Sequence, residues 1–256
     1  MMKRLLALAC ALCAIHLAAA DAPTPAAPAK PAEPAAAAPA PFGRWLLNDA
    51  EGAVIRDAVG KRNGKLLGTP DFVEWTTGGQ DKALRFKNPA KNDKLARIAI
   101  PAGDFDVTKG FSVLVTIRTP DAVPVRSRQY EIVNFTHAFG KPQGFRLLMA
   151  WGAIWLHLGD GKTLVRIDMP STKAKLKPGT WYKVAAVCDG KTAAIWLNGA
   201  KLIEKGGCVL AKPKVRQFTV GAGADKYYGF EGILSNLVIY NAAVPEAVIQ
   251  NYCQAE

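Results

Sequence analysis

The stretch Gly179–Gly199 has the sequence GTWYKVAAVCDGKTAAIWLNG and contains two short apolar runs. Asp189-Gly190 separates the runs and Asn198-Gly199 follows the second, and both dipeptides favour the positive φ angles of tight hairpin turns. Because side chains alternate between the two faces of a strand, the first run divides into two sets. These are Val184, Ala186 and Cys188 on one face, and Lys183, Ala185 and Val187 on the other. Both sets are partly apolar, which indicates a strand inside a two-layer sandwich.

Short apolar stretches bounded by Gly, Pro, Asn and Asp continue on both sides of this hairpin. The predicted strands are Phe111–Arg118, Glu131–Phe135, Phe145–Trp151, Ile154–Leu158, Leu164–Met169, Trp181–Cys188, Thr192–Leu197, Gln217–Ala222 and Gly232–Tyr240. The one long helical pattern covers Pro245–Gln254. Many short strands with turn signals between them are typical of a sandwich or a barrel.

The stretch that ends at Gly199 resembles the laminin G-like jelly-roll domains of the concanavalin A-like superfamily. Those domains carry a G-x-W-x-x-V-A-x-V-x-D-G strand followed by a Y-V-N-G hairpin. Further segments agree with the same family in the same order: Trp45, Asp57–Gly68, Lys82–Phe86, Gly110–Ile117 and Tyr228–Tyr240. The resemblance covers nearly all of residues 42–256. It implies an all-β fold, namely a two-sheet antiparallel jelly-roll sandwich with a short C-terminal helix.

Residues 1–20 have the pattern of a secretory signal peptide. Two basic residues precede the apolar stretch Leu5–Leu17, which is too short to span a bilayer comfortably, and three alanines then offer a cleavage site. Residues 21–41 are almost entirely Ala and Pro, the composition of a disordered linker. We therefore expect a signal peptide at 1–20, a linker at 21–41 and one domain at 42–256. The expected location is secreted, periplasmic or cell-surface, without a membrane span.

The chain is basic, since 33 Lys and Arg residues against 21 Asp and Glu residues give a formal net charge of +12. This excess favours anionic partners such as acidic glycans. The basic residues are spread along the chain without a run of five or more and without a recognisable nucleic-acid-binding motif. No nucleic-acid partner is therefore expected.

Three cysteines follow the predicted signal peptide: Cys188, Cys208 and Cys253. An odd number leaves one thiol unpaired, or leaves all three free and buried as small apolar residues. The expected pair is Cys188 with Cys208, because the two hairpin turns between them return the chain to the same end of the sheet. A zinc site is not indicated, since no C-x-x-C spacing occurs among the three.

The family resemblance raises the question of a structural calcium ion. Many relatives end on a G-x-I-D-D-V-R-I-Y strand whose acidic pair helps to hold one, and Ser235 and Asn236 stand at the two acidic positions here. Calcium prefers several oxygen ligands that include carboxylates. Calcium is therefore doubtful, with Asn48 and Asp49 as fallback ligands, and no other cofactor is expected.

Catalytic signatures are absent from the sequence. Retaining glycosidases need two carboxylates about 5 to 5.5 Å apart, and the nearest candidate pair, Asp104 and Asp106, lies in a predicted loop. The motifs of jelly-roll alginate lyases are not reproduced either. His137 and His157 have no base or nucleophile at a recognisable spacing. We expect a binding protein rather than an enzyme.

The expected function is carbohydrate binding, with acidic glycans as the favoured ligands. Alternation along two predicted strands leaves Trp155, His157 and Trp196 opposite the core-forming residues, while Tyr227 and Tyr228 precede the final strand. Aromatic rings on an open sheet face can stack on sugars, so these five residues form the predicted site. A competing interpretation is that both tryptophans fill the core. The alternative functions are an extracellular protein-interaction or adhesion module and, third, an unrecognised glycoside hydrolase or polysaccharide lyase.

Overall fold

The computed structural model describes residues 38–49, 51–76, 82–89, 91–122, 128–136, 142–170, 175–223 and 228–255. These residues belong to the compact unit Ala36–Glu256. The predicted signal peptide, most of the predicted linker, His137 and Tyr227 lie outside the described residues.

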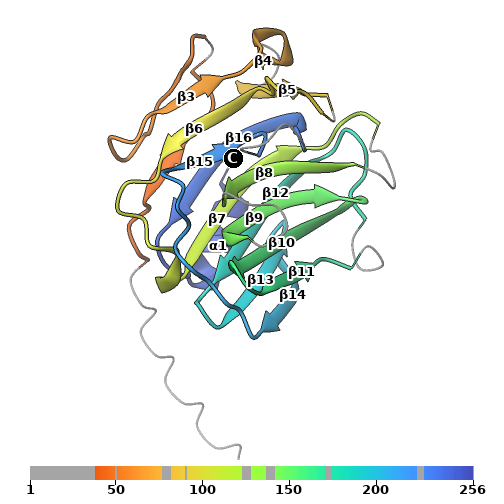
Figure 1. The fold of residues 1–256 in the computed structure, drawn as a ribbon. Helices are drawn as coiled ribbons and strands as arrows, with labels where there is room; N and C mark the ends of the chain where they lie inside the picture. Colours follow the sequence, from red (N-terminus) through yellow and green to blue (C-terminus); the bar gives the residue numbers. More distant parts are fainter. Residues whose placement is uncertain are drawn as a thin grey trace, which may run out of the picture. The chain divides into compact units, whose positions relative to one another are not determined.

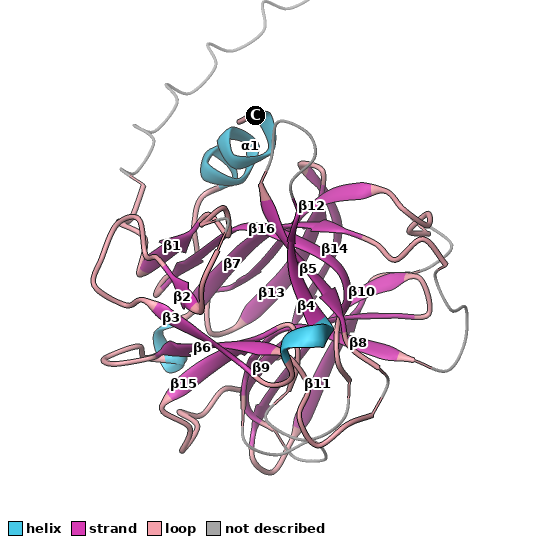
Figure 2. Cartoon of the chain, turned by 90° about the horizontal axis from the view of Figure 1, so that it is seen from above, coloured by secondary structure: helices cyan, strands magenta, loops and turns pink. Residues whose placement is uncertain are grey.

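Two antiparallel sheets form a sandwich, which confirms the predicted fold class (Figures 1 and 2). The first sheet contains, in spatial order, β14 (Ala200–Gly206), β13 (Thr192–Leu197), β12 (Trp181–Cys188), β7 (Phe111–Arg118), β16 (Glu231–Tyr240), β5 (Ala83–Lys87) and β4 (Val73–Thr76), with β1 (Gly43–Trp45) paired to β16. The second contains β11 (Leu164–Asp168), β10 (Ala153–Asp160), β9 (Gln143–Ala150), β8 (Gln129–Phe135), β15 (Gln217–Val220), β6 (Arg97–Pro101), β3 (Gly64–Leu67) and β2 (Val54–Ile55). Two 3-10 turns, η1 (Pro70–Phe72) and η2 (Val107–Lys109), and the helix α1 (Glu246–Gln254) complete the domain.

The hairpin predicted from the sequence forms as expected. β12 and β13 have the predicted bounds, and Asn198 and Gly199 take φ angles of 49° and 85° in the two-residue turn that leads into β14. Asn and Gly are the residues that this turn type prefers. The alternation is also confirmed, since Val184, Ala186 and Cys188 are fully buried in the main core.

The space between the sheets is filled by aliphatic and aromatic side chains. Phe111 of the first sheet stacks on Phe145 of the second with ring centroids 4.1 Å apart. Phe105, Phe135 and Phe218 pack around this pair with centroids 4.5 to 5.4 Å apart. Each fully buried side chain of this size contributes about 1.5–3 kcal/mol to folding, so this layer is the main source of stability.

A second, smaller cluster lies on the outer face of the first sheet, where Figure 2 shows α1 outside the sandwich. Ile249 and Tyr252 of α1 pack there with Ala185 of β12, Trp196 of β13 and other buried residues. The Tyr252 hydroxyl donates a hydrogen bond of 2.6 Å to the backbone oxygen of Asn236. The helix therefore covers a sheet face whose apolar side chains would otherwise contact water.

Two sequence-based predictions need correction. Trp151 was expected at the end of a strand, but β9 ends at Ala150 and Trp151 begins a turn. Cys188, Cys208 and Cys253 are free thiols, so the expected disulfide is not formed. Cys188 and Cys208 are buried and Cys253 is partly buried, so the first two agree with the alternative of free cysteines that pack as small apolar residues.

Candidate functional site

The outer face of the second sheet, at β9, β10 and β11, carries the candidate site. Ile154, Leu156 and Leu158 of β10 point into the core and are fully buried. Alternation places Trp155 and His157 on the opposite face, although neither is open to solvent: their exposed fractions are 4% and 7%. The sequence therefore predicted their face of the strand, and the burial of Trp155, which belongs to the main hydrophobic cluster, agrees with the competing interpretation that it fills the core.

The turn between β9 and β10 presents an exposed indole beside Trp155. Trp151 and Gly152 form a two-residue turn, with Ala150 paired to Ala153, and have φ angles of 51° and 73°. Bulky residues rarely adopt this left-handed conformation. The Trp151 side chain is 50% exposed, and its ring meets the Trp155 ring edge to face at a centroid distance of 4.8 Å. An aromatic surface is thus maintained at the rim of the sheet.

Charged groups of β11 border the two indoles. The Arg166 guanidinium lies 4.9 Å from the centroid of the Trp155 ring, a cation–π geometry, and Arg166 Nη2 also forms a 2.9 Å ion pair with Asp168 Oδ2. His157 Nε2 lies 3.4 Å from Asp168 Oδ1, but the geometry is not that of a hydrogen bond. Neither atom has a hydrogen-bond partner in the described part of the chain. We call Trp151, Trp155, His157, Arg166 and Asp168 the tryptophan platform.

A buried ion pair continues this face beyond His157. Arg146 of β9 is paired with His157 in the ladder, and its Nε and Nη2 atoms donate to Glu131 of β8 at 2.9 and 2.6 Å. The Asn134 amide donates a further bond of 2.8 Å to Glu131. The exposed fractions of Glu131 and Arg146 are 0% and 2%. Fixed ion pairs of this kind hold the neighbouring side chains in place.

The structure separates the predicted site residues into two groups. Trp155 and His157 lie together, and Tyr228 is close by, because its ring centroid is 5.4 Å from the Arg146 guanidinium. Trp196 lies instead on the outer face of the first sheet, in the cluster under α1. Tyr227 is outside the described residues.

Sequence reasoning missed the exposed Trp151 and the charged residues around it. The signal for Trp151 was its Gly neighbour between two predicted strands, which is the pattern of a two-residue turn. Arg166 and Asp168 alternate along β11 and so share a face, but only the pairing of β11 with β10 brings them to Trp155 and His157.

The family comparison agrees with this architecture. A family profile described as Laminin G 3, of the concanavalin A-like lectin/glucanases superfamily, matches residues 92–250. The chain belongs to this laminin G-like family. No curated protein matches the sequence of this laminin G-like domain.

Several solved structures share the fold of this laminin G-like domain at low sequence identity. Domain 4 of AbnA, an extracellular arabinanase from Geobacillus stearothermophilus, has a TM-score of 0.63 at 15% identity, over 85% of this chain and 99% of that one. The binding domain of Paraclostridial Mosquitocidal Protein 1 has a TM-score of 0.64 at 16% identity, over 82% and 51%. The binding domain of botulinum neurotoxin serotype D has a TM-score of 0.62 at 12% identity, over 84% of this chain and 51% of that one. The chain thus spans about half the length of the two toxin domains.

In the laminin G-like domain, two of the residues considered as calcium ligands contact arginine side chains. Asn236 Oδ1 accepts a hydrogen bond from Arg44 at 3.3 Å, and Asp49 Oδ1 forms an ion pair with Arg56 at 3.0 Å. Both oxygens thus face guanidinium groups, which do not fit a cation site. Across the described ranges, no group of three or more His, Cys, Asp or Glu residues could hold a metal ion.

The carboxylates singled out in the sequence are structural. A hydrogen bond from Arg62 lowers the pKa of Asp104, and a hydrogen bond from the Thr108 side chain lowers the pKa of Asp106. Asp106 also caps η2 by accepting from the Thr108 backbone amide. A general acid needs a raised pKa to be protonated at neutral pH, so this pair does not have the properties of a glycosidase acid.

No helix in the described residues is long and apolar enough to cross a membrane.

Proposed function

We propose that the chain is a non-catalytic carbohydrate-binding module and that sugars bind at the tryptophan platform. The observation that carries the proposal is Trp151, a half-exposed indole held at a φ of 51°. A non-glycine residue in this conformation costs on the order of 1–3 kcal/mol, and such strain is concentrated at functional sites. An exposed aromatic residue in a strained turn therefore favours a ligand-binding role over a structural one.

The chemistry of the platform suits a sugar. The exposed Trp151 ring offers an apolar surface for the C–H face of a pyranose or furanose ring. Arg166 and Asp168, whose side chains are partly exposed, supply hydrogen-bond donors and acceptors for hydroxyl groups. A few polar groups beside an aromatic surface are typical of small-molecule sites.

Related folds are compatible with this proposal. The AbnA domain 4 structure is a complex with arabinotriose, and a botulinum neurotoxin binding domain is described in complex with SialylT. The binding domain of the same neurotoxin, type DC, also has a structure in complex with rat synaptotagmin II, so relatives of this fold include both glycan and protein binders. The choice between these classes therefore depends on the residues of the site.

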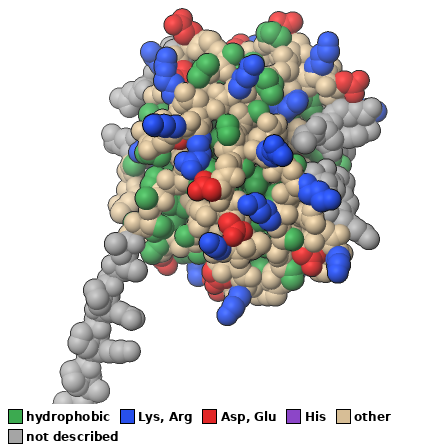
Figure 3. All heavy atoms as spheres, turned by 60° about the vertical axis from the view of Figure 1, so that its left-hand side comes forward, with side chains coloured by type: hydrophobic (Ala, Val, Ile, Leu, Met, Phe, Trp, Pro, Cys, Tyr) green, Lys and Arg blue, Asp and Glu red, His purple; other side chains and the backbone are tan. Residues whose placement is uncertain are grey.

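A preference for acidic glycans would come from the whole-molecule charge rather than from the platform. Asp168 compensates Arg166, and Glu131 compensates Arg146. The net charge of +12 is distributed, and Figure 3 shows Lys and Arg side chains scattered over one face. We propose that this field favours anionic glycans at long range. We also propose that the signal-like residues 1–20 direct export of the protein. Binding of anionic glycans should then weaken with salt, while binding of neutral glycans should not.

The test is a glycan array with the purified full chain and its Trp151→Ala variant. Loss of retention with only a small fall in melting temperature is expected, because half of the Trp151 side chain contacts solvent and the rest contacts Trp155. The matched control is Trp181→Ala, since Trp181 is 42% exposed at the start of β12 on the other sheet. Equal retention by the native chain and Trp151→Ala, or equal loss in both variants, would exclude the platform as the site. A blank array for the native chain would favour the protein-interaction alternative.

A further inference from the structure

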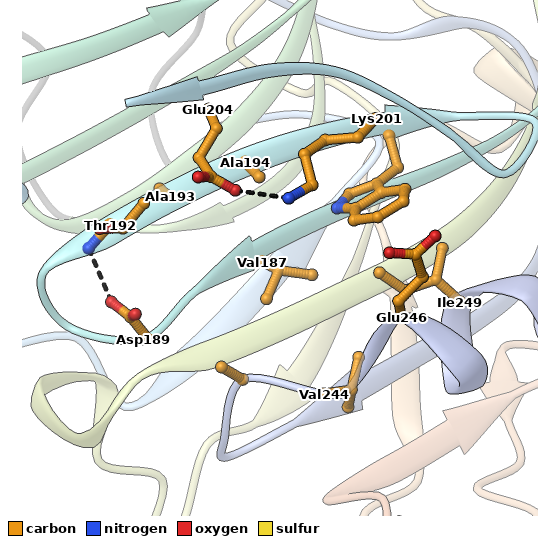
Figure 4. Close-up of a pocket in the computed structure, with 12 residues that line it drawn as sticks. Val187, Asp189, Thr192, Ala193, Ala194, Lys201, Glu204, Val244, Glu246 and Ile249 are labelled. Carbon is orange, nitrogen blue, oxygen red and sulfur yellow. Dashed lines mark hydrogen bonds and ion pairs between the residues drawn. The ribbon is translucent and has the colours of Figure 1, made fainter. Parts of the chain in front are cut away.

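A cavity of about 230 Å³ lies on the outer face of the first sheet, next to α1 and on the other sheet from the tryptophan platform. Its floor is apolar and is made by Val187 of β12 and Ala194 of β13, which are paired in the ladder. Figure 4 shows Lys201 and Glu204 on one side of this floor, Glu246 and Ile249 on another, and Asp189 at one end. Trp196, paired with Lys201, also lines the cavity.

One position in the cavity is already occupied by a cation. Lys201 Nζ lies 5.2 Å from the centroid of the Trp196 ring and 2.7 Å from Glu204 Oε2. The bond to Glu204 raises the pKa of Lys201, with a further contribution from Glu246. The Lys201 ammonium therefore occupies a position where a cation contacts both an aromatic ring and carboxylate groups. A cation from another molecule could take the same position.

Negative charge exceeds positive charge at this cavity, although the chain as a whole is strongly basic. Three carboxylates line it, from Asp189, Glu204 and Glu246, against the single ammonium of Lys201. Asp189 Oδ1 accepts backbone bonds from Lys191 and Thr192, at 2.8 and 2.6 Å, which lower the Asp189 pKa and keep it ionised. Among the described residues, neither Asp189 nor Glu246 forms an ion pair within 4.0 Å. Asp189 and Glu246 thus retain carboxylate oxygens that no ion pair within the described residues occupies.

We propose that this cavity binds an arginine side chain presented by a protein partner. A guanidinium group is planar and can stack on the Trp196 indole, while its forked N–H groups suit Glu204 and Glu246. The apolar floor suits the methylene stem of the arginine. The Lys201–Glu204 pair is about half exposed, and exposed pairs are weak, so the incoming guanidinium displaces Lys201 readily.

The first measurement uses the native full chain with two small probes, N-acetyl-arginine amide and N-acetyl-citrulline amide. Citrulline has nearly the same shape as arginine but no charge. The indole N–H resonance of Trp196, assigned with a Trp196→Phe variant, is followed by NMR during titration. The arginine probe should shift this resonance with a millimolar dissociation constant, and the citrulline probe should bind at least about tenfold more weakly.

Variants sharpen the assignment. Glu204→Gln and Glu246→Gln should each weaken arginine binding about fivefold, and Lys201→Met should strengthen it because the cation position becomes vacant. The matched control is Lys162→Met, an exposed lysine in the turn after β10, which should have no effect. Glu246→Gln and Lys201→Met also preserve the apolar contacts of the cavity, so their folding is expected to be native and is checked by the melting temperature.

Three results would overturn the proposal: no shift of the Trp196 resonance, equal shifts with both probes, or a shift that survives both Glu→Gln changes. A glycan that shifts Trp196 instead would make the cavity a second sugar subsite. Because the readout is Trp196 on the first sheet, failure here leaves the proposed function at Trp151 untouched, and failure of glycan binding leaves this cavity untouched.

Discussion

Two hairpins of this domain have turns with similar φ angles but with very different residues at the first turn position. The hairpin β13–β14 turns through Asn198-Gly199 with φ angles of 49° and 85°, and β9–β10 turns through Trp151-Gly152 with φ angles of 51° and 73°. Asn-Gly is the preferred sequence for such a turn. Tryptophan at the first position is unfavourable both for the backbone and because half of the indole is exposed. The difference indicates that the Asn198-Gly199 sequence of β13–β14 suits the turn itself, whereas the Trp151-Gly152 sequence of β9–β10 places an aromatic side chain on the surface.

The similarity of the hairpins extends to their strands. Each contains one buried tryptophan, Trp155 in β10 and Trp196 in β13, and each indole has a cation over its ring at 4.9 Å and 5.2 Å respectively. The surroundings differ, since Trp196 lies in the apolar cluster under α1, whereas Trp155 contacts Trp151 and His157. The same alternating pattern therefore produces a face that packs against α1 in the β13–β14 hairpin, and a face with aromatic and polar side chains in the β9–β10 hairpin.

The largest expected effect concerns the reactivity of the thiols next to the β13–β14 hairpin. Cys208 follows β14, and Cys188 is the last residue of the neighbouring β12. Burial raises the pKa of Cys188 to about 12 and also raises the pKa of Cys208 and Cys253. A pKa near 12 leaves a thiolate fraction of only about 10⁻⁴ at pH 8. Alkylation at pH 8 should therefore modify the half-buried Cys253 first and Cys188 last, as measured by mass spectrometry over time. If Cys188 and Cys208 react only after reduction, they form the disulfide expected from the sequence.

The next effect compares one ion pair from each hairpin. Arg146→Met leaves the Glu131 carboxylate buried with the Asn134 amide as its remaining side-chain donor in the described structure, so a loss of about 3–5 kcal/mol in unfolding free energy is expected. Lys201→Met removes the exposed Lys201–Glu204 pair and should cost less than about 1 kcal/mol. Both values come from urea unfolding. The double variant Glu131→Met with Arg146→Met should be more stable than Arg146→Met alone, because no buried charge is left without its partner. Equal losses in the two single variants would contradict the difference between the pairs.

Replacing the buried tryptophans tests whether both belong to the core. Trp155→Ala and Trp196→Ala should each lower the unfolding free energy by about 3 kcal/mol, the lower end for a buried aromatic, because each indole borders solvent at one edge. Glycan retention should fall in Trp155→Ala only, since Trp196 is on the other sheet. A fully stable Trp155→Ala that still loses retention would instead make Trp155 a direct ligand contact.

Much of the fold could be predicted from the sequence because it depends on local rules. Alternation placed the faces of β12 correctly, and Asn198-Gly199 predicted its turn, since both depend on neighbours within a few residues. β14 has a mixed exposed pattern and was not predicted. Its pairing with β13 follows from the turn and not from its own apolar residues.

The candidate site was harder to predict because it depends on pairing between strands. Alternation identified the face of Trp155 and Trp196, but it could not show that the two belong to different sheets or that α1 covers one of them. Arg166 reaches Trp155 only through the β10–β11 ladder. The exposure of Trp151 follows from a turn that its own residue type disfavours, so a propensity argument points away from it.

The smallest expected effect isolates the turn at Trp151. Trp151→Ala and Trp151→Asn both remove the edge-to-face contact with Trp155, so the difference between them reports the backbone alone. Asn tolerates the left-handed conformation and Ala does not, so Trp151→Asn should be the more stable variant by about 1 kcal/mol, while both lose glycan retention equally. In the other hairpin, Asn198→Ala should lose about 1–2 kcal/mol, because the bond of 2.9 Å from the Lys183 amide to Asn198 Oδ1 disappears together with the turn preference. Thermal unfolding of the three variants measures both differences. If Trp151→Asn were no more stable than Trp151→Ala, the turn would not be strained, and the argument that a function maintains tryptophan there would lose its basis.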